Sequence, residues 1–179
     1  MRRFLIVVTT AVLALLAGSV ASAEVRKAGP VSHDSEVSAQ ALAGPYTWVN
    51  VRSRLCLDQD WSNGGPHANI LTFTCNRQTN QDWWWDPQPD GSIRLINVRS
   101  GQCLDQDYTD GVPHYAALAW DCNGGDNQRW WPSFDPGSNS YVLINVRSGW
   151  VLDQDWHDGV QHPEVVVVPF NGGSNQSWF

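Results

Sequence analysis

A threefold internal repeat constrains the fold of this chain more than any other feature of its sequence. The segment Leu-Asp-Gln-Asp-aromatic recurs within CLDQDW (residues 56–61), CLDQDY (103–108) and VLDQDW (151–156). The motif Asn-Val-Arg-Ser begins at residues 50, 97 and 145, with the same offsets of 47 and then 48 residues. A unit of this size cannot bury a core by itself. We therefore expect three units that pack around one shared core, at about 46–91, 92–137 and 138–179.

Each unit is predicted to consist of short β-strands. Apolar and aromatic residues fall in short runs separated by Gly, Asn, Asp and Pro, and no helical period is sustained. In the second unit these runs place strands near Ile93–Val98, Cys103–Tyr108, Ala116–Asp121 and Arg129–Phe134. Four strands in each of three units give about twelve strands, so the sequence predicts an all-β fold.

The four cysteines follow the repeat. Two pairs are each separated by 19 residues: Cys56 with Cys75, and Cys103 with Cys122. The equivalent positions of the third unit hold an apolar pair, Val151 and Phe170. We expect one disulfide in each of the first two units, worth roughly 3 kcal/mol in the chain-entropy model, and apolar packing between Val151 and Phe170 in the third.

The N-terminal residues are expected to lie outside the repeat domain, which we place at 46–179. Arg2 and Arg3 precede an uncharged apolar run, and Ala21-Ser22-Ala23 supplies small residues of the cleavage-site type. Residues 1–23 therefore have the pattern of a secretory signal peptide. Residues 24–45 mix small, polar and charged residues without a sustained period, which predicts a flexible tail. Together with the paired cysteines, this predicts a secreted, extracellular protein.

The charge of the chain favours a neutral ligand. The sequence has 11 Lys and Arg against 18 Asp and Glu, and its net charge is −7. Loss of residues 1–23 removes Arg2 and Arg3 but no acidic residue, which moves the net charge from −7 to −9. We expect no nucleic-acid partner, because no basic patch remains. We expect no membrane insertion, because no other apolar stretch is long enough.

The motifs together resemble those of the ricin B-type lectin family. Each unit carries a Gln-x-Trp near its end, in phase with the Asp-Gln-Asp segment: Gln81 to Trp83, Gln128 to Trp130, and Gln176 to Trp178. The resemblance covers about residues 46–179 and implies a β-trefoil fold of three four-stranded repeats. The three tryptophans are expected in the core, because a shared core needs large rings in phase. We expect the three glutamines to bond turn backbone or the nearby aspartate rather than a ligand directly.

The resemblance also implies a shallow sugar pocket in each unit, or lobe. Its parts are an Asp that accepts hydrogen bonds from hydroxyls, an aromatic ring that stacks on the sugar, and an Asn-Gln pair. The second lobe has every part: Asp105, Trp120, Asn127 and Gln128. The first lobe has Asp58, Phe73, Asn80 and Gln81. The third lobe has Asp153, Asn175 and Gln176, but Val168 stands at the aromatic position and cannot stack.

Other chemistry is less favoured by the same residues. Glycoside hydrolysis needs two acids on opposite sides of a bond, whereas Asp-Gln-Asp puts both on one strand face in all three units, so we expect no enzyme. Asp105, Asp107 and Asp110 could supply Ca²⁺ ligands, but the spacing misses the EF-hand loop and suits a turn. We predict no metal and no cofactor. One histidine per lobe falls in phase (His67, His114 and His162), with no neighbouring Cys or His at zinc spacing. Each either touches a sugar or packs in a loop.

Two alternatives stay open for the second half of each repeated segment. Asp60, Asp107 and Asp155, with the aromatic residue that follows each, either form the rim of a pocket or a charged turn with a packed ring.

The sequence as a whole predicts a secreted carbohydrate-binding protein, either a lectin or a stand-alone module. We expect it to bind neutral glycans or polysaccharides, with galactose- or xylose-type sugars as candidates, through two or three lobes. The alternatives are a β-trefoil that binds a protein, such as a secreted protease inhibitor, and a non-catalytic targeting subunit of a separate glycoside hydrolase.

Overall fold

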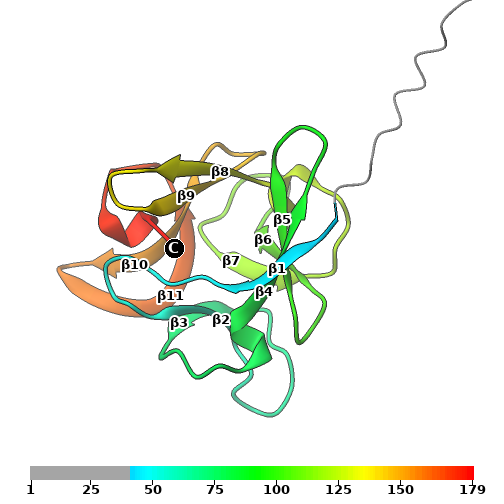
Figure 1. Cartoon of the computed structure of the whole chain (residues 1–179), viewed down its shortest axis with the longest axis horizontal. Helices are drawn as coiled ribbons and strands as arrows, with labels where there is room; N and C mark the ends of the chain where they lie inside the picture. The colour runs from blue at the N-terminus through cyan, green and yellow to red at the C-terminus, as the bar shows by residue number, and fades with distance from the viewer. Residues whose placement is uncertain (1–40) are drawn as a thin grey trace, which may run out of the picture. The chain divides into compact units, whose positions relative to one another are not determined.

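The computed structural model describes residues 41–179, which form three units around a common centre (Figure 1). The expected signal peptide and nearly all of the expected tail lie outside these residues. The first unit contains β1 (Ala43–Thr47), β2 (Cys56–Gln59), β3 (Ile70–Phe73) and β4 (Asp82–Pro87). The second contains β5 (Ile93–Asn97), β6 (Cys103–Gln106), β7 (Ala117–Trp120) and β8 (Trp130–Asp135). The third contains β9 (Ser140–Asn145), β10 (Val151–His157) and β11 (Val160–Val168).

A short 3₁₀ helix stands in the last part of each unit: η1 (Thr79–Gln81), η2 (Asp126–Gln128) and η3 (Ser174–Gln176). Within residues 41–179, no helix is long and apolar enough to span a bilayer. The described residues therefore form the all-β domain that the sequence predicts.

The first and last strands of the units form a closed antiparallel ring. β1 pairs with β4, β4 with β5, β5 with β8, and β8 with β9. Trp178 then bridges both Tyr141 on β9 and Asn50 in the first unit, which closes the ring. The second and third strands of each unit form a hairpin, and the three hairpins also pair with one another, through Leu71 with Glu164, Asn69 with Leu118, and Ala116 with Val166. This is the topology of a β-trefoil.

Strand positions agree closely with those expected. All four strands expected in the second unit are present, each within two residues of the expected ends. The structure has eleven strands rather than about twelve, because the segment equivalent to β4 and β8 in the third unit pairs only through isolated bridges at Trp178.

β1 starts inside the last three residues of the stretch expected as a tail. β1 begins at Ala43, which pairs with Trp85 on β4, so residues 43–45 belong to the domain. The pairing shifts register between Ala43 and Tyr46. The Gly and Pro in this stretch are typical of a linker. Here they lie at the register shift of an edge strand, where both residues are tolerated.

The core is built on the three in-phase tryptophans, as expected. Trp83, Trp130 and Trp178 have no exposed surface. The indole N–H of each donates a hydrogen bond of 3.1 Å to the backbone carbonyl of the Leu in its own repeated segment: Leu57, Leu104 and Leu152. These leucines are also fully buried. Because a buried indole N–H needs a partner, this bond fixes each repeated segment against the core.

Both expected disulfides are confirmed, and the expected replacement in the third unit is wrong. Cys56 is bonded to Cys75 and Cys103 to Cys122. Val151 is buried, but Phe170 is 61% exposed and cannot pack as a core partner. The positions of Cys75 and Cys122 are themselves exposed, so the second half of the pair lies at the surface in every unit. The third unit therefore lacks an equivalent cross-link.

Candidate functional site

A buried carboxylate held by two amides is the centre of the second lobe. Asp105 lies on β6 with only 4% of its surface exposed. Asn127 Nδ2 donates to its Oδ1 at 2.8 Å, and Gln128 Nε2 donates to its Oδ2 at 2.8 Å. Both amides come from η2. An ionised carboxylate has about four acceptor positions, so about two remain after these bonds.

Gln128 positions Asp105 and has no polar atom left for a ligand. Its Nε2 also donates to the carbonyl of Asp121 at 3.0 Å, and its Oε1 accepts the backbone N–H of Asn123 at 2.9 Å. The residue has no exposed surface. This is the role expected for the glutamine of Gln-x-Trp, which is to bond turn backbone and the nearby aspartate.

The first lobe repeats this arrangement in full, and the third lobe repeats its asparagine contact. In the first lobe, Asn80 donates to Asp58 at 2.9 Å and Gln81 donates to it at 2.7 Å. In the third lobe, Asn175 donates to Asp153 at 2.7 Å. Gln176 accepts the backbone N–H of residue 171 at 2.8 Å and has no exposed surface. Burial raises the pKa of Asp58, Asp105 and Asp153 above the usual value of 3.8, and the amide hydrogen bonds oppose that rise.

The lobes differ in the side chain that overlies the carboxylate. Trp120 at the end of β7 is 54% exposed and borders a hollow of about 330 Å³ with Asp105 and Asn127. Phe73 at the end of β3 is 55% exposed and borders a hollow of about 510 Å³ with Asp58 and Asn80. A large ring that stays exposed at a strand end is available to stack. The third lobe has only Val168 at this position.

The aromatic residue that ends each repeated segment packs under an arginine of the next unit. The Arg99 guanidinium lies 4.1 Å from the ring centre of Trp61, and that of Arg147 lies 3.9 Å from Tyr108. Arg52 of the first unit lies 3.7 Å from Trp156 of the third, which completes the cycle. These are cation–π distances. The Asn-Val-Arg-Ser motif thus supplies one contact across each boundary between units.

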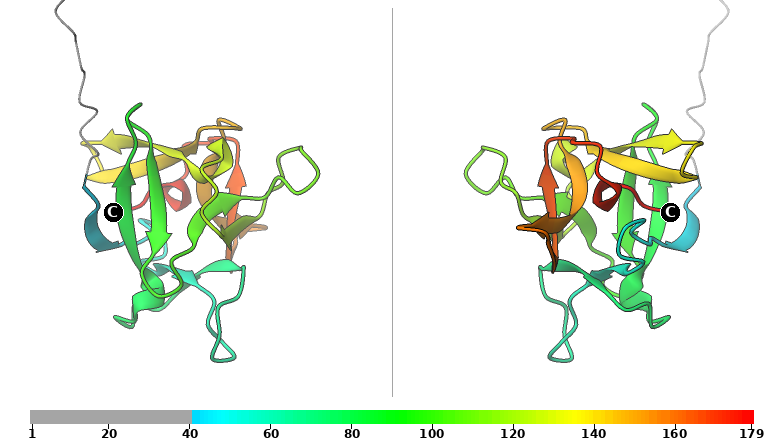
Figure 2. Two further views of the ribbon diagram at one scale, coloured as in Figure 1. Left: turned by 90° about the vertical axis from the view of Figure 1, so that its right-hand side faces the viewer. Right: turned by 90° about the vertical axis from the view of Figure 1, so that its left-hand side faces the viewer.

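For Asp60 and Asp107, the turn interpretation and the pocket-rim interpretation both agree with the structure. The backbone N–H of Ser62 donates to Asp60 at 2.9 Å, and that of Thr109 donates to Asp107 at 2.9 Å, which is an Asx turn. Asp60 and Trp61 also border the first hollow, and Asp107 and Tyr108 border the second. The loops that begin at these turns project outward in Figure 2, between β2 and β3 and between β6 and β7.

In the first two units the middle glutamine of Asp-Gln-Asp contacts the next unit, a role that was not predicted from the sequence. In the third unit the Oε1 of Gln154 is buried without a hydrogen-bond partner. Ser100 Oγ donates to Gln59 Oε1 at 2.6 Å, and Ser148 Oγ donates to Gln106 Oε1 at 2.6 Å. Each serine is the last residue of an Asn-Val-Arg-Ser motif. The Asp-Gln-Asp and Asn-Val-Arg-Ser motifs recur at the same offsets, but equal offsets alone do not show that the two motifs meet across a boundary between units.

Turn contacts occupy the acidic loop considered for Ca²⁺. Asp110 Oδ1 lies 2.8 Å from a ring nitrogen of His114 and accepts the backbone N–H of Val112 at 3.2 Å. The hydrogen bond from His114 lowers the pKa of Asp110. His114 therefore packs in its own loop, and it is not among the residues that border the second hollow.

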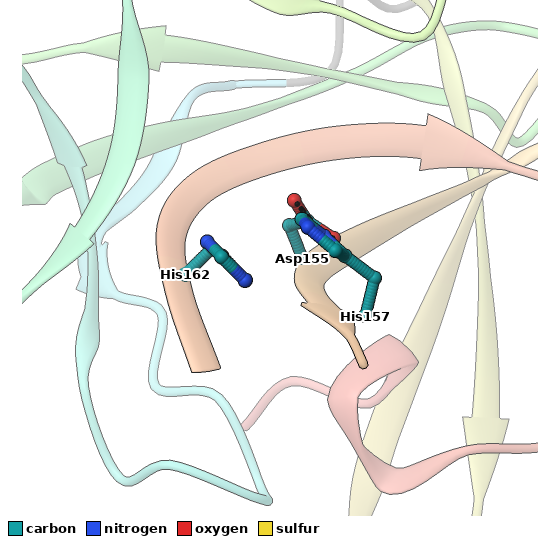
Figure 3. Close-up of side chains that lie close together, drawn as sticks. All are labelled: Asp155, His157 and His162. Carbon is teal, nitrogen blue, oxygen red and sulfur yellow. Dashed lines mark hydrogen bonds and ion pairs between the residues drawn. The ribbon is translucent and has the colours of Figure 1, made fainter. Parts of the chain in front are cut away.

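The third lobe holds a histidine pair. His157 and His162 stack with ring centres 3.9 Å apart, beside Asp155 (Figure 3). The expectation that the in-phase histidines have no neighbour at zinc spacing is therefore wrong for His162, because four residues separate it from His157, a spacing that zinc ligands use.

A further aromatic hollow, of about 410 Å³, lies away from the three carboxylates. Tyr46, Trp48, Trp85 and Tyr141 are among the residues that border it. It contains no charged side chain, so it lacks the carboxylate that defines the sites in the lobes.

Comparison with known proteins agrees with this geometry. The model of the ricin-type beta-trefoil lectin domain matches residues 45–178. A designed three-fold symmetric protein, ThreeFoil, is 28% identical, with a TM-score of 0.64 over 74% of this chain and 94% of that one. An exo-beta-1,3-galactanase from Clostridium thermocellum is 26% identical, with a TM-score of 0.61 over 74% of this chain but only 29% of that one.

A ricin B-like lectin from Macrolepiota procera, solved in complex with lactose, has the same fold. It is 17% identical, with a TM-score of 0.60 over 78% of this chain and 96% of that one. A search of curated proteins gave no match. Because the family model covers three quarters of the sequence and the three lobes carry its arrangement, this chain belongs to the family of ricin-type β-trefoil lectin domains.

Proposed function

We propose that this protein is a secreted, non-catalytic carbohydrate-binding protein that takes neutral glycans or polysaccharides at its first two lobes. One observation carries the proposal. In each of these lobes an amide-held carboxylate opens into a hollow beside an exposed aromatic ring: Asp105 with Trp120, and Asp58 with Phe73.

Each part has a role that suits a sugar ring. The two free acceptor positions of Asp105 take hydrogen bonds from two adjacent hydroxyls, because a carboxylate accepts from several donors. The indole face of Trp120 covers the apolar C–H face of the same ring. Asn127 and Gln128 fix the carboxylate before binding, which lowers the entropy cost of forming the site.

The ligand class follows from charge and from the relatives. The net charge of −7 disfavours an acidic polymer as the ligand. The lectin solved with lactose and the exo-beta-1,3-galactanase support galactose-containing glycans as the first ligands to test, with xylose-type polymers beside them. Single shallow sites bind weakly, and two lobes engaging one polymer can raise the avidity by roughly 10²–10⁴.

A glycan and polysaccharide array on the purified chain tests the proposal, with two matched variants. Asp105→Ala and Asp153→Ala each remove a buried carboxylate from an equivalent strand and take one acceptor from an equivalent asparagine, which keeps its bond to a backbone carbonyl. Their effects on folding should therefore be alike. We expect Asp105→Ala to weaken binding more than Asp153→Ala, because the second lobe has a stacking ring and the third lobe has none. Equal effects, or no binding to any neutral glycan, would contradict the proposal.

A further inference from the structure

The two strands of the β10–β11 hairpin in the third lobe pair over a greater length than the strands of the equivalent hairpins, β2–β3 and β6–β7. In the first two lobes Pro66 and Pro113 precede the in-phase histidine, and a proline cannot donate a ladder hydrogen bond. The third lobe has Gln161 at this position, and it pairs with Trp156. The strands continue to a two-residue turn at Asp158 and Gly159, both with positive φ (53° and 73°), as an Asp-Gly hairpin turn requires.

A second substitution places a new side chain on this extended hairpin. His157 stands where the other lobes have Ser62 and Thr109. Alternate residues of a strand face the same side, so Asp155 and His157 project together from β10. His162 on β11 projects to the same side (Figure 3).

The three side chains are close enough to share one ion. His157 Nδ1 lies 3.0 Å from both carboxylate oxygens of Asp155. The rings of His157 and His162 are 3.9 Å apart and nearly parallel, with an angle of 6° between them. One potential ligand atom from each residue lies within 4.8 Å of those of the other two.

We propose that Asp155, His157 and His162 bind one Zn²⁺ or a similar divalent transition-metal ion. Two imidazoles and one carboxylate form a donor set that zinc uses, with water as the fourth ligand. Imidazole is a poor ligand for Ca²⁺ and Mg²⁺, which prefer oxygen. The site is therefore different in kind from a calcium site in the acidic turns.

Binding needs only small movements of one exposed and two half-buried side chains. The His157 side chain is 58% exposed and that of Asp155 is 25% exposed. Both rings can turn about their side-chain bonds until one nitrogen of each points to the ion, without displacing any core residue. Coordination of both side chains to the ion then replaces the hydrogen bond between His157 and Asp155.

The other two lobes do not offer this site. His67 and His114 are in phase with His162, but a serine and a threonine stand where His157 does. His114 is bonded to Asp110 in its own loop. We therefore expect one ion per chain.

An ion at this position would stabilise the third unit. The third unit lacks the disulfide found in the other two, and an ion would cross-link β10 to β11 there. An ion that binds only the folded protein stabilises it by mass action. Zinc should therefore raise the melting temperature of the chain, with a size that depends on zinc concentration.

The test is a titration of the untagged, metal-stripped full chain with ZnCl₂ by calorimetry, and with Co²⁺ by visible absorption. We expect one ion per chain and Co²⁺ bands of tetrahedral intensity. His157→Ser, which copies the first lobe, and His162→Ala should each weaken binding at least tenfold. His114→Ser, which removes an in-phase histidine outside the site, should leave binding unchanged.

Several results would overturn the proposal: no zinc binding at micromolar concentrations, binding retained in both His157→Ser and His162→Ala, or binding lost in His114→Ser. A melting curve for each variant shows that it is folded. Glycan binding is measured separately on metal-stripped protein, so failure of the zinc site and failure of the proposed function are distinguishable.

Discussion

The substitution Trp120→Ala tests the stacking role that separates the second lobe from the third. Trp120 is 54% exposed at the end of β7, where its ring borders the hollow beside Asp105. The substitution removes the ring and leaves the carboxylate and its amide partners in place. Its effect should therefore appear in ligand binding far more than in folding.

The magnitude follows from the surface that a sugar would cover. A tryptophan side chain presents up to about 250 Å², so about 130 Å² of Trp120 faces solvent. A sugar face that covers about half of it removes roughly 65 Å² from water, which contributes about 1.6 kcal/mol at 25 cal/mol per Å². This corresponds to a loss of about 15-fold in affinity when the ring is removed.

Calorimetry with the best ligand from the array measures this loss. Trp131→Ala is the matched control, because Trp131 is also a partly exposed tryptophan, at 38%, and does not border the hollow. To isolate the second lobe, both are made in a chain that carries Phe73→Ala. Equal affinity for Trp120→Ala and Trp131→Ala would refute the stacking argument, and a large drop in melting temperature for Trp120→Ala alone would show that the ring is structural.

Two further predictions concern the lobes. Val168→Trp should add a stacking ring to the third lobe and raise the number of sites seen by calorimetry, since Asp153 and Asn175 already have the required arrangement; an unchanged number of sites would show that the lobe lacks more than the ring. Because burial raises the pKa of Asp105, its carboxylate takes up a proton at a higher pH than the usual 3.8, and the protonated form loses acceptor positions. Affinity measured from neutral pH downward should therefore start to fall above pH 3.8, and a constant affinity down to that pH would contradict a direct role for the carboxylate.

Periodicity made the architecture predictable from the sequence. Offsets of 47 and 48 residues fix which side chains are equivalent, and equivalent large rings such as Trp83 and Trp130 can only meet in a shared core. The same offsets place the cysteines correctly, because a pair confined to one unit closes a short loop. The aspartates and asparagines of the sites followed from the resemblance of the motifs.

Contacts between units could not be predicted in the same way. The offset shows that Gln59 and Ser53 belong to the same unit, but it does not show that Gln59 meets Ser100 of the next one. That contact depends on how the units turn about their common centre. The strand pairing in the third hairpin was missed for another reason. It depends on Gln161 having an N–H where the other units have proline, a local difference that the strong similarity of the repeats concealed.

Two of the differences between the lobes lie outside the contacts that hold the ring together. Every unit keeps its buried Leu and Trp and an Arg stacked on a neighbouring ring. These two differences fall at a strand end (Phe73, Trp120 and Val168) and just after the repeated segment (Ser62, Thr109 and His157), whereas the missing disulfide of the third unit is a difference in its cross-linking. A change there removes little buried surface, so its cost in folding free energy is small. One lobe can therefore lack a stacking ring and carry a second histidine while the shared core and the other two sites stay intact. This separation is the physical reason to expect different ligands at different lobes of one repeat protein.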